Sequence, residues 1–249
     1  RLAAVNSINW ARVLAQVVYY FTAATALGAP HRKVSFAVPT GNFGDVFAGY
    51  VARRMGLPID RLVVATNRND ILHRTLQTGA YTKETVAPTI SPSMDIQVSS
   101  NFERALFDVY DRDGAAVADQ MRMLKEEGAF PISQGALARL REVFDSGRAS
   151  EAETTETIRR AFDETGEVLC PHTAVGVKVA REAADPAVPM VTLATAHPAK
   201  FPDAVAEAMG TRPALPNRMA DLYERSERMT SVANDLAAVE SLIEEKIPA

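Results

Sequence analysis

The stretch V-P-T-G-N-F-G-D-V, Val38 to Val46, decides the fold. It joins the apolar run Val34–Val38 to Phe43–Met55, a segment with helical periodicity that stops before a glycine and a proline. A buried strand that leads through a loop into a helix is typical of parallel α/β proteins, in which ligands lie beyond the carboxyl ends of the strands. The two glycines, the amide and the carboxylate at this junction therefore mark a candidate ligand site.

A helix is expected before this junction. Asn6 or Ser7 can cap its first turn, and Gly28 with Pro30 ends it. Apolar residues recur along it and are expected to face inward: Ile8, Val13, Leu14, Val17, Val18 and Phe21.

A second strand and helix follow the junction. Leu62–Ala65 is an apolar run that ends in the polar loop T-N-R-N-D. Asn69 or Asp70 can cap the next helix, which ends at Gly79. Repeats of strand, loop and helix predict parallel strands.

The composition changes between residues 80 and 165, where we expect a mostly helical insertion without strands. Its expected helices are Phe102–Tyr110, Val117–Glu127, Gln134–Phe144 and Glu153–Asp163. The alternation then resumes with a strand, a helix and a strand at Val168–Leu169, His172–Ala184 and Met190–Ala194. We therefore predict an α/β domain from residues 1–79 and 166–210, with a parallel sheet flanked by helices, the insertion 80–165, and a charged helical tail 211–249.

Composition excludes several classes of protein. Apolar residues make up 47% and charged residues 23%, which is typical of a globular protein with a core. The net charge of -4 gives no support for nucleic-acid or membrane-surface binding, and no run approaches the roughly 18 apolar residues of a membrane span. The single cysteine, Cys170, excludes an internal disulfide and fits a reducing compartment, so we expect a cytoplasmic location. The chain starts at Arg1 without a methionine, which indicates part of a longer protein.

The loop from Gly41 to Asp45 suits a phosphate. A helix start offers free N–H groups and partial positive charge, and glycines allow the backbone to approach an anion closely. The loop lacks the Gly-Lys-Ser/Thr of a P-loop and the glycine spacing of a dinucleotide fingerprint. From spacing alone, a simple strand-to-helix turn with Asp45 in the first helical turn explains the stretch equally well.

Other chemistry is sparse. The histidines, His31, His73, His172 and His197, share no metal-ligand spacing, so we expect surface or hydrogen-bonded side chains and no metal site. There is no G-x-S-x-G, H-E-x-x-H or C-x-x-C motif. Cys170 is expected to be a small buried residue.

Six motifs, however, stand in the order found in threonine synthase of the longer, bacterial and fungal type. They are N-S-I-N-W-A-R at 6–12, P-T-G-N-F-G-D at 39–45, A-T-N-R-N-D-I-L at 65–72, S-P-S-M-D-I-Q-V-S-S-N-F-E-R at 91–104, P-H-T-A-V-G at 171–176 and T-A-H-P-A-K-F at 195–201. The chain resembles the C-terminal half of that family over nearly its whole length.

The resemblance implies a pyridoxal-phosphate (PLP) enzyme of the tryptophan-synthase-β family, or PLP fold type II. Its members convert O-phospho-L-homoserine and water to L-threonine and phosphate. The residues that match the family's loop for the cofactor phosphate are Gly41, Asn42, Phe43, Gly44 and Asp45. Thr195 matches the hydroxyl residue beside the pyridine nitrogen of PLP, where a hydroxyl, unlike an aspartate, does not enforce protonation of the ring.

The resemblance also implies where the substrate binds. Asn6, Ser7 and Arg12 match positions that hold the substrate's own phosphate, and a helix start, a hydroxyl and a guanidinium are suitable donors. The alternative is a helix cap with a surface arginine. Weaker candidates lie on the loop after the second strand: Asn67, Arg68 and Asn69.

The lysine that carries PLP as a Schiff base lies in the family's N-terminal half, so we expect no catalytic residue in this chain and an N-terminal half as its partner. None of the lysines matches that position: Lys33, Lys83, Lys125, Lys178, Lys200 and Lys246. Two alternatives stay open. One is another PLP lyase of the same fold, similar to threonine dehydratase, and the other is a non-catalytic remnant that binds a phosphate ligand.

Overall fold

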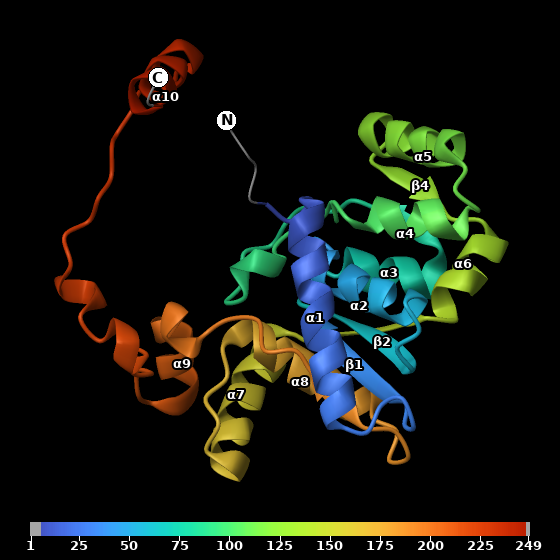
Figure 1. Ribbon diagram of the computed structural model, residues 1–249, viewed down its shortest axis with the longest axis horizontal. Coiled ribbons are helices and arrows are strands. Elements are labelled where there is room, and N and C mark those ends of the chain that lie inside the picture. The colour runs from blue at the N-terminus through green and yellow to red at the C-terminus, as the bar shows by residue number, and fades with distance from the viewer. Residues whose placement is uncertain (1–5, 248–249) are drawn as a thin grey trace. The chain divides into compact units, whose positions relative to one another are not determined.

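A computed structural model describes residues 6–247, so the ends of the expected domains at 1 and 249 lie outside the described residues. The main sheet has four strands in the order β5-β2-β1-β6, and every neighbouring pair is parallel. Its central strands β1 and β2 lie side by side (Figure 1). The strands are β1 Val34–Pro39, β2 Ile59–Thr66, β5 Phe144–Arg148 and β6 Met190–Thr192. The prediction of a parallel sheet flanked by helices is therefore confirmed.

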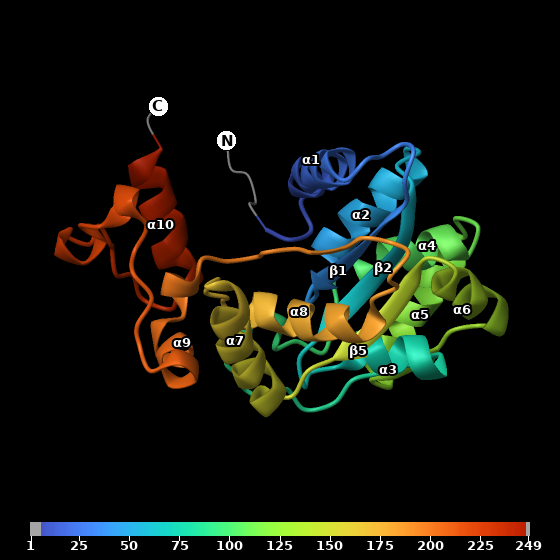
Figure 2. The ribbon, with the colours of Figure 1, turned by 90° about the horizontal axis from the view of Figure 1, so that it is seen from below.

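Both faces of the two central strands are covered. Successive side chains of a strand point to opposite faces, so Phe36 and Val38 pack into one apolar cluster while Ala37 packs into another. Helices α1 (Trp10–Ala26) and α2 (Gly44–Arg54) cover the first face, and α8 (Pro171–Ala183) covers the second (Figure 2). This burial explains why β1 and the second half of β2 are largely apolar in the sequence.

Helix α1 begins later than expected. Its cap is Asn9, whose side chain accepts a hydrogen bond from Ala11 N at 2.9 Å. The predicted cap at Asn6 or Ser7 is wrong, because the chain there forms a separate turn in which Asn6 Oδ1 accepts from Ile8 N at 3.2 Å.

The inward face of α1 also differs from the prediction. Its buried residues are Val13, Val17, Tyr20 and Ala24. Leu14 is 48% exposed and Val18 is 60% exposed, and Ile8, ahead of the helix, is 50% exposed. The helix is apolar around most of its circumference, so periodicity could not select the face that packs on α2.

The helices after β2 and before β6 lie where the sequence predicts them. Helix α3 spans Ile71–Thr78 and ends at Gly79, whose φ of 79° is the left-handed conformation expected of a terminating glycine. Helix α8 is capped by the buried Cys170, whose Sγ accepts from Thr173 N at 3.4 Å. The predicted strand Val168–Leu169 is wrong: these residues form an irregular connection, and Leu169 packs beside Ile158 and Ala174.

The segment 80–165 contains the four expected helices, α4 Phe102–Val109, α5 Gly114–Glu126, α6 Gln134–Arg141 and α7 Glu151–Thr165. The expectation that it lacks strands is wrong. Strands β3 (Ala80–Thr82) and β4 (Ala129–Pro131) form an antiparallel pair, and β5 joins the main sheet beside β2. Strand β5 reads F-D-S-G-R, and its place at the edge of the sheet removes the need for an apolar run.

The described residues divide into two compact units, with the boundary between Pro213 and Ala214. The first unit ends with α9, Pro202–Met209. The second contains short 3-10 turns at Asn217–Met219 and Leu222–Glu224 and the helix α10, Leu236–Lys246, so much of the expected helical tail is irregular.

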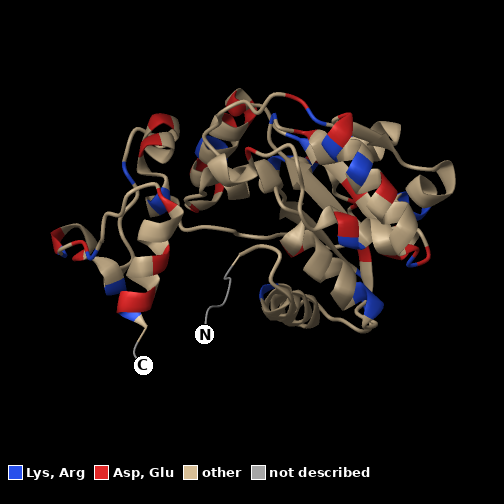
Figure 3. Ribbon diagram, turned by 90° about the horizontal axis from the view of Figure 1, so that it is seen from above, with Lys and Arg blue, Asp and Glu red and all other residues tan. Residues whose placement is uncertain are grey.

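Surface charges of both signs are interspersed along the helices (Figure 3). On α7, Arg159 pairs with Glu156 and Arg160 pairs with Glu164. Helix α1 is different, because Arg12 is its single charged residue. Within residues 6–247, no helix has the length and apolarity that crossing a bilayer requires.

Candidate functional site

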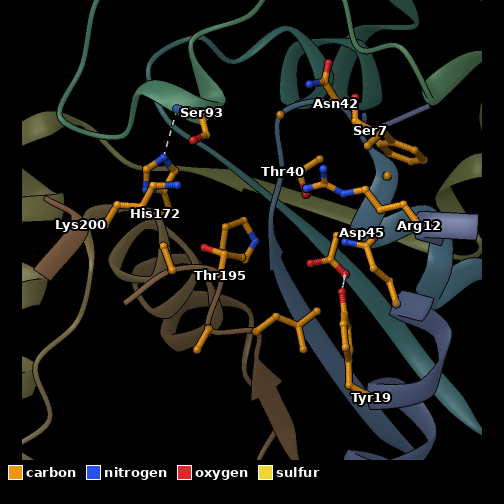
Figure 4. A pocket seen from close by; sticks show the side chains of 18 of the residues that line it. Ser7, Arg12, Tyr19, Thr40, Asn42, Asp45, Ser93, His172, Thr195 and Lys200 are labelled. Carbon is orange, nitrogen blue, oxygen red and sulfur yellow. Dashed lines mark hydrogen bonds between the residues drawn. The ribbon is translucent and has the colours of Figure 1, made fainter. Parts of the chain in front are cut away.

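A cavity of about 860 Å³ lies at the carboxyl ends of β1 and β6. The chain passes from β1 to β2 on one side and later places β6 on the other side of β1, so the direction of strand order reverses between β1 and β6. In parallel α/β sheets, ligands bind in the crevice at such a reversal. The candidate loop Gly41–Asp45 forms part of the wall of this cavity (Figure 4).

The backbone of this loop is ready to bind an anion. In the part of the chain that the structure describes, no N–H group from Gly41 to Asp45 has a hydrogen-bond acceptor. Phe43 has φ 62° and ψ 4°, a left-handed conformation that is rare for a bulky residue. Its ring is buried, with its centroid 5.2 Å from the ring centroids of both Phe102 and Phe144, and this packing holds Phe43 in its left-handed conformation.

The outer side of the loop is braced by residues 91–101. Ser99 Oγ donates to Gly41 O at 2.8 Å, and a Cβ on Gly41 would stand 2.7 Å from Ser93 O. Real Cβ atoms do not approach a backbone oxygen so closely, so Gly41 is required here by close packing. The motif S-P-S-M-D-I-Q-V-S-S-N thus supports the loop from behind.

Asn101 connects this brace to the turn before α1. Its Nδ2 donates to Asn42 O at 2.9 Å and to Ser7 O at 3.0 Å. Asn101 is fully buried, and its side chain lies 3.3 Å from the position of a Cβ on Gly44. One buried amide therefore fixes Ser7 beside the loop Gly41–Asp45.

Asp45 does not point its carboxyl at the loop's free N–H groups. The carboxyl accepts a hydrogen bond from the phenol of Tyr19 (Figure 4) and a second one, at 3.3 Å, from Tyr20 Oη, which also donates to Asp45 O at 2.9 Å. Burial raises the pKa of Asp45, while these hydrogen bonds and the nearby Arg12 lower it in part. Burial and the neighbouring Asp45 raise the pKa of Tyr19 in turn. The side chain of Asp45 therefore links α2 to α1, and its backbone faces the cavity.

Cationic and polar side chains stand on opposite sides of the cavity (Figure 4). On one side, the exposed Arg12 and the partly exposed Ser7 lie beside the loop. On the other side are Thr195, His172 and Lys200. Thr195 is exposed, and its N–H donates to Thr173 Oγ1 at 3.2 Å, which fixes the backbone that carries the hydroxyl.

Comparisons with known proteins identify the fold and the family. The sequence profile described as "Threonine synthase, C-terminal" matches residues 173–243. The threonine synthase of Pseudomonas aeruginosa is 56% identical over 98% of this chain and 52% of its own length. This chain is homologous to the C-terminal portion of threonine synthase.

Solved threonine synthases agree with this assignment. The crystal structure of PLP-bound threonine synthase from Brucella melitensis has a TM-score of 0.95 at 58% identity and covers 98% of this chain and 53% of that chain. The crystal structure of threonine synthase from yeast has a TM-score of 0.89 at 39% identity, and the match covers 98% of this chain and 53% of the yeast chain. The predicted fold type II is therefore confirmed, and the chain spans about half the length of the curated relatives it matches.

The predicted threonine synthase residues divide into two groups. The structure brings together at the cavity Gly41, Asn42, Phe43, Gly44, Asp45, Thr195, Ser7 and Arg12. Asn6 is exposed and does not line the cavity. The weaker candidates Asn67 and Asn69 are buried in a polar network, in which both donate to Asp95 Oδ1 at 2.8 and 2.9 Å, so they hold the segment before residue 95 in place. Arg68 is exposed and also lies away from the cavity wall.

Several residues of the cavity wall were not predicted from the sequence to lie at the site, among them Tyr19, Ser93, His172 and Lys200. The expectation of surface or hydrogen-bonded histidines is confirmed, because His31 is exposed and His73, His172 and His197 form hydrogen bonds. Of the lysines, all of which the structure describes, Lys200 alone lines the cavity. Among the described residues, no group of three or more His, Cys, Asp and Glu side chains is placed to hold a metal ion.

Proposed function

We propose that this chain forms the C-terminal half of a PLP-dependent threonine synthase, which converts O-phospho-L-homoserine and water to L-threonine and phosphate. The observation that carries the proposal is the run of unpaired N–H groups from Gly41 to Asp45 on the wall of the 860 Å³ cavity. The high identity to threonine synthases supports the choice of reaction over other reactions of this fold.

The residues present fit PLP. The unpaired N–H groups of the loop suit its phosphate, since they stand at the start of α2, where the helix dipole also favours an anion. The carboxyl of Asp45 is bound to Tyr19 and Tyr20 of α1 and makes no hydrogen bond to the loop's N–H groups. Thr195 offers a hydroxyl from the opposite wall of the cavity for the pyridine nitrogen.

When bound, PLP supplies the electron sink for bond changes at the substrate's carbon atoms. The loop Gly41–Asp45 would hold the cofactor phosphate, and the hydroxyl of Thr195 would orient the ring without forcing a proton onto its nitrogen. Arg12 and Ser7 would bind the phosphate that leaves the substrate, because a guanidinium and a hydroxyl form strong hydrogen bonds to phosphate oxygens.

The proton-transferring lysine is proposed to come from an N-terminal half of the same enzyme. The relatives are about twice as long as this chain, which leaves room for that half. We further propose that residues 1–249 alone are inactive and that the full enzyme works in the cytoplasm, consistent with the single unpaired cysteine.

The proposal is tested with purified full-length protein and PLP. Release of phosphate and formation of L-threonine from O-phospho-L-homoserine are expected, and residues 1–249 alone should give neither product. Formation of 2-oxobutyrate from L-threonine at a greater rate would favour the dehydratase-like alternative. PLP binding with no reaction on either substrate would favour a non-catalytic remnant.

A further inference from the structure

His172 has a hydrogen-bond arrangement that fixes its charge and tautomer. Its Nε2 lies 3.1 Å from Ser93 N, and a backbone N–H can only donate, so Nε2 must accept and carry no proton (Figure 4). The ring is therefore neutral, with its proton on Nδ1. Within the described chain Nδ1 has no hydrogen-bond partner.

The surroundings of His172 favour the same state. The side chain is 4% exposed, and its ring centroid lies 4.7 Å from that of Phe201. Burial and the nearby Lys200 lower the pKa of His172 to about 4, against a smaller opposite effect of Asp95. At neutral pH the ring therefore acts as a permanent acceptor for Ser93.

Ser93, whose N–H is held by His172, packs directly against the loop Gly41–Asp45. Its carbonyl oxygen is the atom that leaves no room for a Cβ on Gly41, at 2.7 Å. The opposite end of the same segment is tied to the loop through Asn101, whose N–H donates to Asn42 O at 3.0 Å. His172 thus fixes the Ser93 end and Asn101 fixes the other.

We propose that His172 is a positioning residue: by accepting the Ser93 N–H through Nε2, it sets the Ser93 backbone against Gly41 and so holds the loop in the conformation that binds the cofactor phosphate. This inference rests on the proposed function. It assigns His172 no contact with substrate and no proton transfer.

Two variants with similar polarity separate this role from simple packing. In His172→Gln, the amide oxygen can reach the position of Nε2 and accept from Ser93. In His172→Asn, the shorter side chain cannot, so the N–H of Ser93 loses the protein acceptor that holds it in place. We expect the PLP dissociation constant of the full-length protein to rise at least about fivefold in His172→Asn, which corresponds to about 1 kcal/mol. His172→Gln should stay within about twofold of wild type.

The measurement is a fluorescence titration of the folded apoprotein with PLP, with circular dichroism to confirm folding of each variant. Equal PLP affinity in His172→Asn and wild type would overturn the inference, as would equal losses in both variants. If the wild type itself fails to bind PLP, the proposed function fails instead.

A second measurement does not depend on how the variants fold. The nitrogen-15 spectrum of the His172 ring in wild-type protein at neutral pH should show a protonated Nδ1 and an unprotonated Nε2. A proton on Nε2 would contradict the assignment.

Discussion

The carbonyl oxygen of Ser93 lies 2.7 Å from the point at which a Cβ on Gly41 would stand. Neither group can move away cheaply, because Ser93 N–H is bound to His172 and Gly41 O is bound to Ser99. The loop Gly41–Asp45, which lines the cavity, therefore requires a residue without a side chain at position 41.

Gly41→Ala tests this packing. The added methyl group must push the loop away from Ser93, which misplaces the N–H groups, so we expect PLP affinity of the full-length protein to fall at least about tenfold, or 1.4 kcal/mol. Gly135→Ala is the matched control, since nothing lies within 4 Å of a Cβ at that position. Titration of both folded variants with PLP measures the effect, and equal affinities would contradict it.

Arg12 is expected to act on the substrate and not on the cofactor. It lines the cavity, lies in the first turn of α1, and makes no ion pair with a carboxylate among the described residues. Hydrogen bonds to charged groups contribute roughly 1.5–3 kcal/mol, so Arg12→Ala should lower kcat/KM for O-phospho-L-homoserine by about 10- to 150-fold with PLP affinity nearly unchanged.

The control for Arg12 is Arg32→Ala, which removes an exposed arginine outside the cavity wall. Inorganic phosphate should inhibit the wild type and Arg32→Ala more strongly than Arg12→Ala. A normal kcat/KM and unchanged phosphate inhibition in Arg12→Ala would show that Arg12 is a surface residue that does not bind the substrate.

Asp45 should make stability depend on pH. Burial raises its pKa in the folded state, so below the unfolded pKa the carboxyl is protonated in both states and folding carries no ionisation cost. As the pH rises from the unfolded pKa through the folded pKa, that cost appears and the free energy of unfolding falls.

Asp45→Asn removes the titration and keeps an oxygen that accepts from Tyr19. Its free energy of unfolding relative to wild type should therefore increase as the pH rises from about 4 through the folded-state pKa of Asp45. Urea unfolding at a series of pH values provides the test. A difference that stays constant with pH, or that shrinks as pH rises, would show that Asp45 is not held with a raised pKa.

Thr195 is expected to tune the cofactor ring. One neutral hydrogen bond contributes about 0.5–1.5 kcal/mol. If Thr195 forms it with the ring in the transition state, Thr195→Ala should lower kcat by about 2- to 13-fold and shift the absorbance spectrum of bound PLP. Thr25→Ala is a suitable control, because Thr25 Oγ1 bonds to Phe21 O within α1. An unchanged kcat and spectrum in Thr195→Ala would remove the residue from the site.

The sequence predicted those helices and strands whose burial or termination is visible in neighbouring residues of the sequence. Strand β1 and the second half of β2 are buried on both faces and so are largely apolar, and Gly79 ends α3 as its conformation requires. Strand β5 lies at an edge and needs no such run, which is why F-D-S-G-R was missed. The inward face of α1 depends on its contact with α2, which the sequence of α1 does not encode by itself.

The candidate site shows the same division. The loop Gly41–Asp45 could be found from its chemistry, because glycines at a strand-to-helix junction suit an anion. The roles of Ser93, Asn101 and His172 could not, since each acts through a contact between segments distant in sequence. The motifs that contain them pointed to a family but gave no reason for these residues.

We propose above that the N–H groups from Gly41 to Asp45 bind the phosphate of PLP. A crystal structure of the full-length protein with PLP tests it most directly. We predict that the cofactor phosphate lies within hydrogen-bonding distance of these backbone nitrogens, with the aldehyde carbon joined to a lysine outside residues 1–249. A phosphate bound to a different loop, or a covalent bond between PLP and Lys200, would contradict the account.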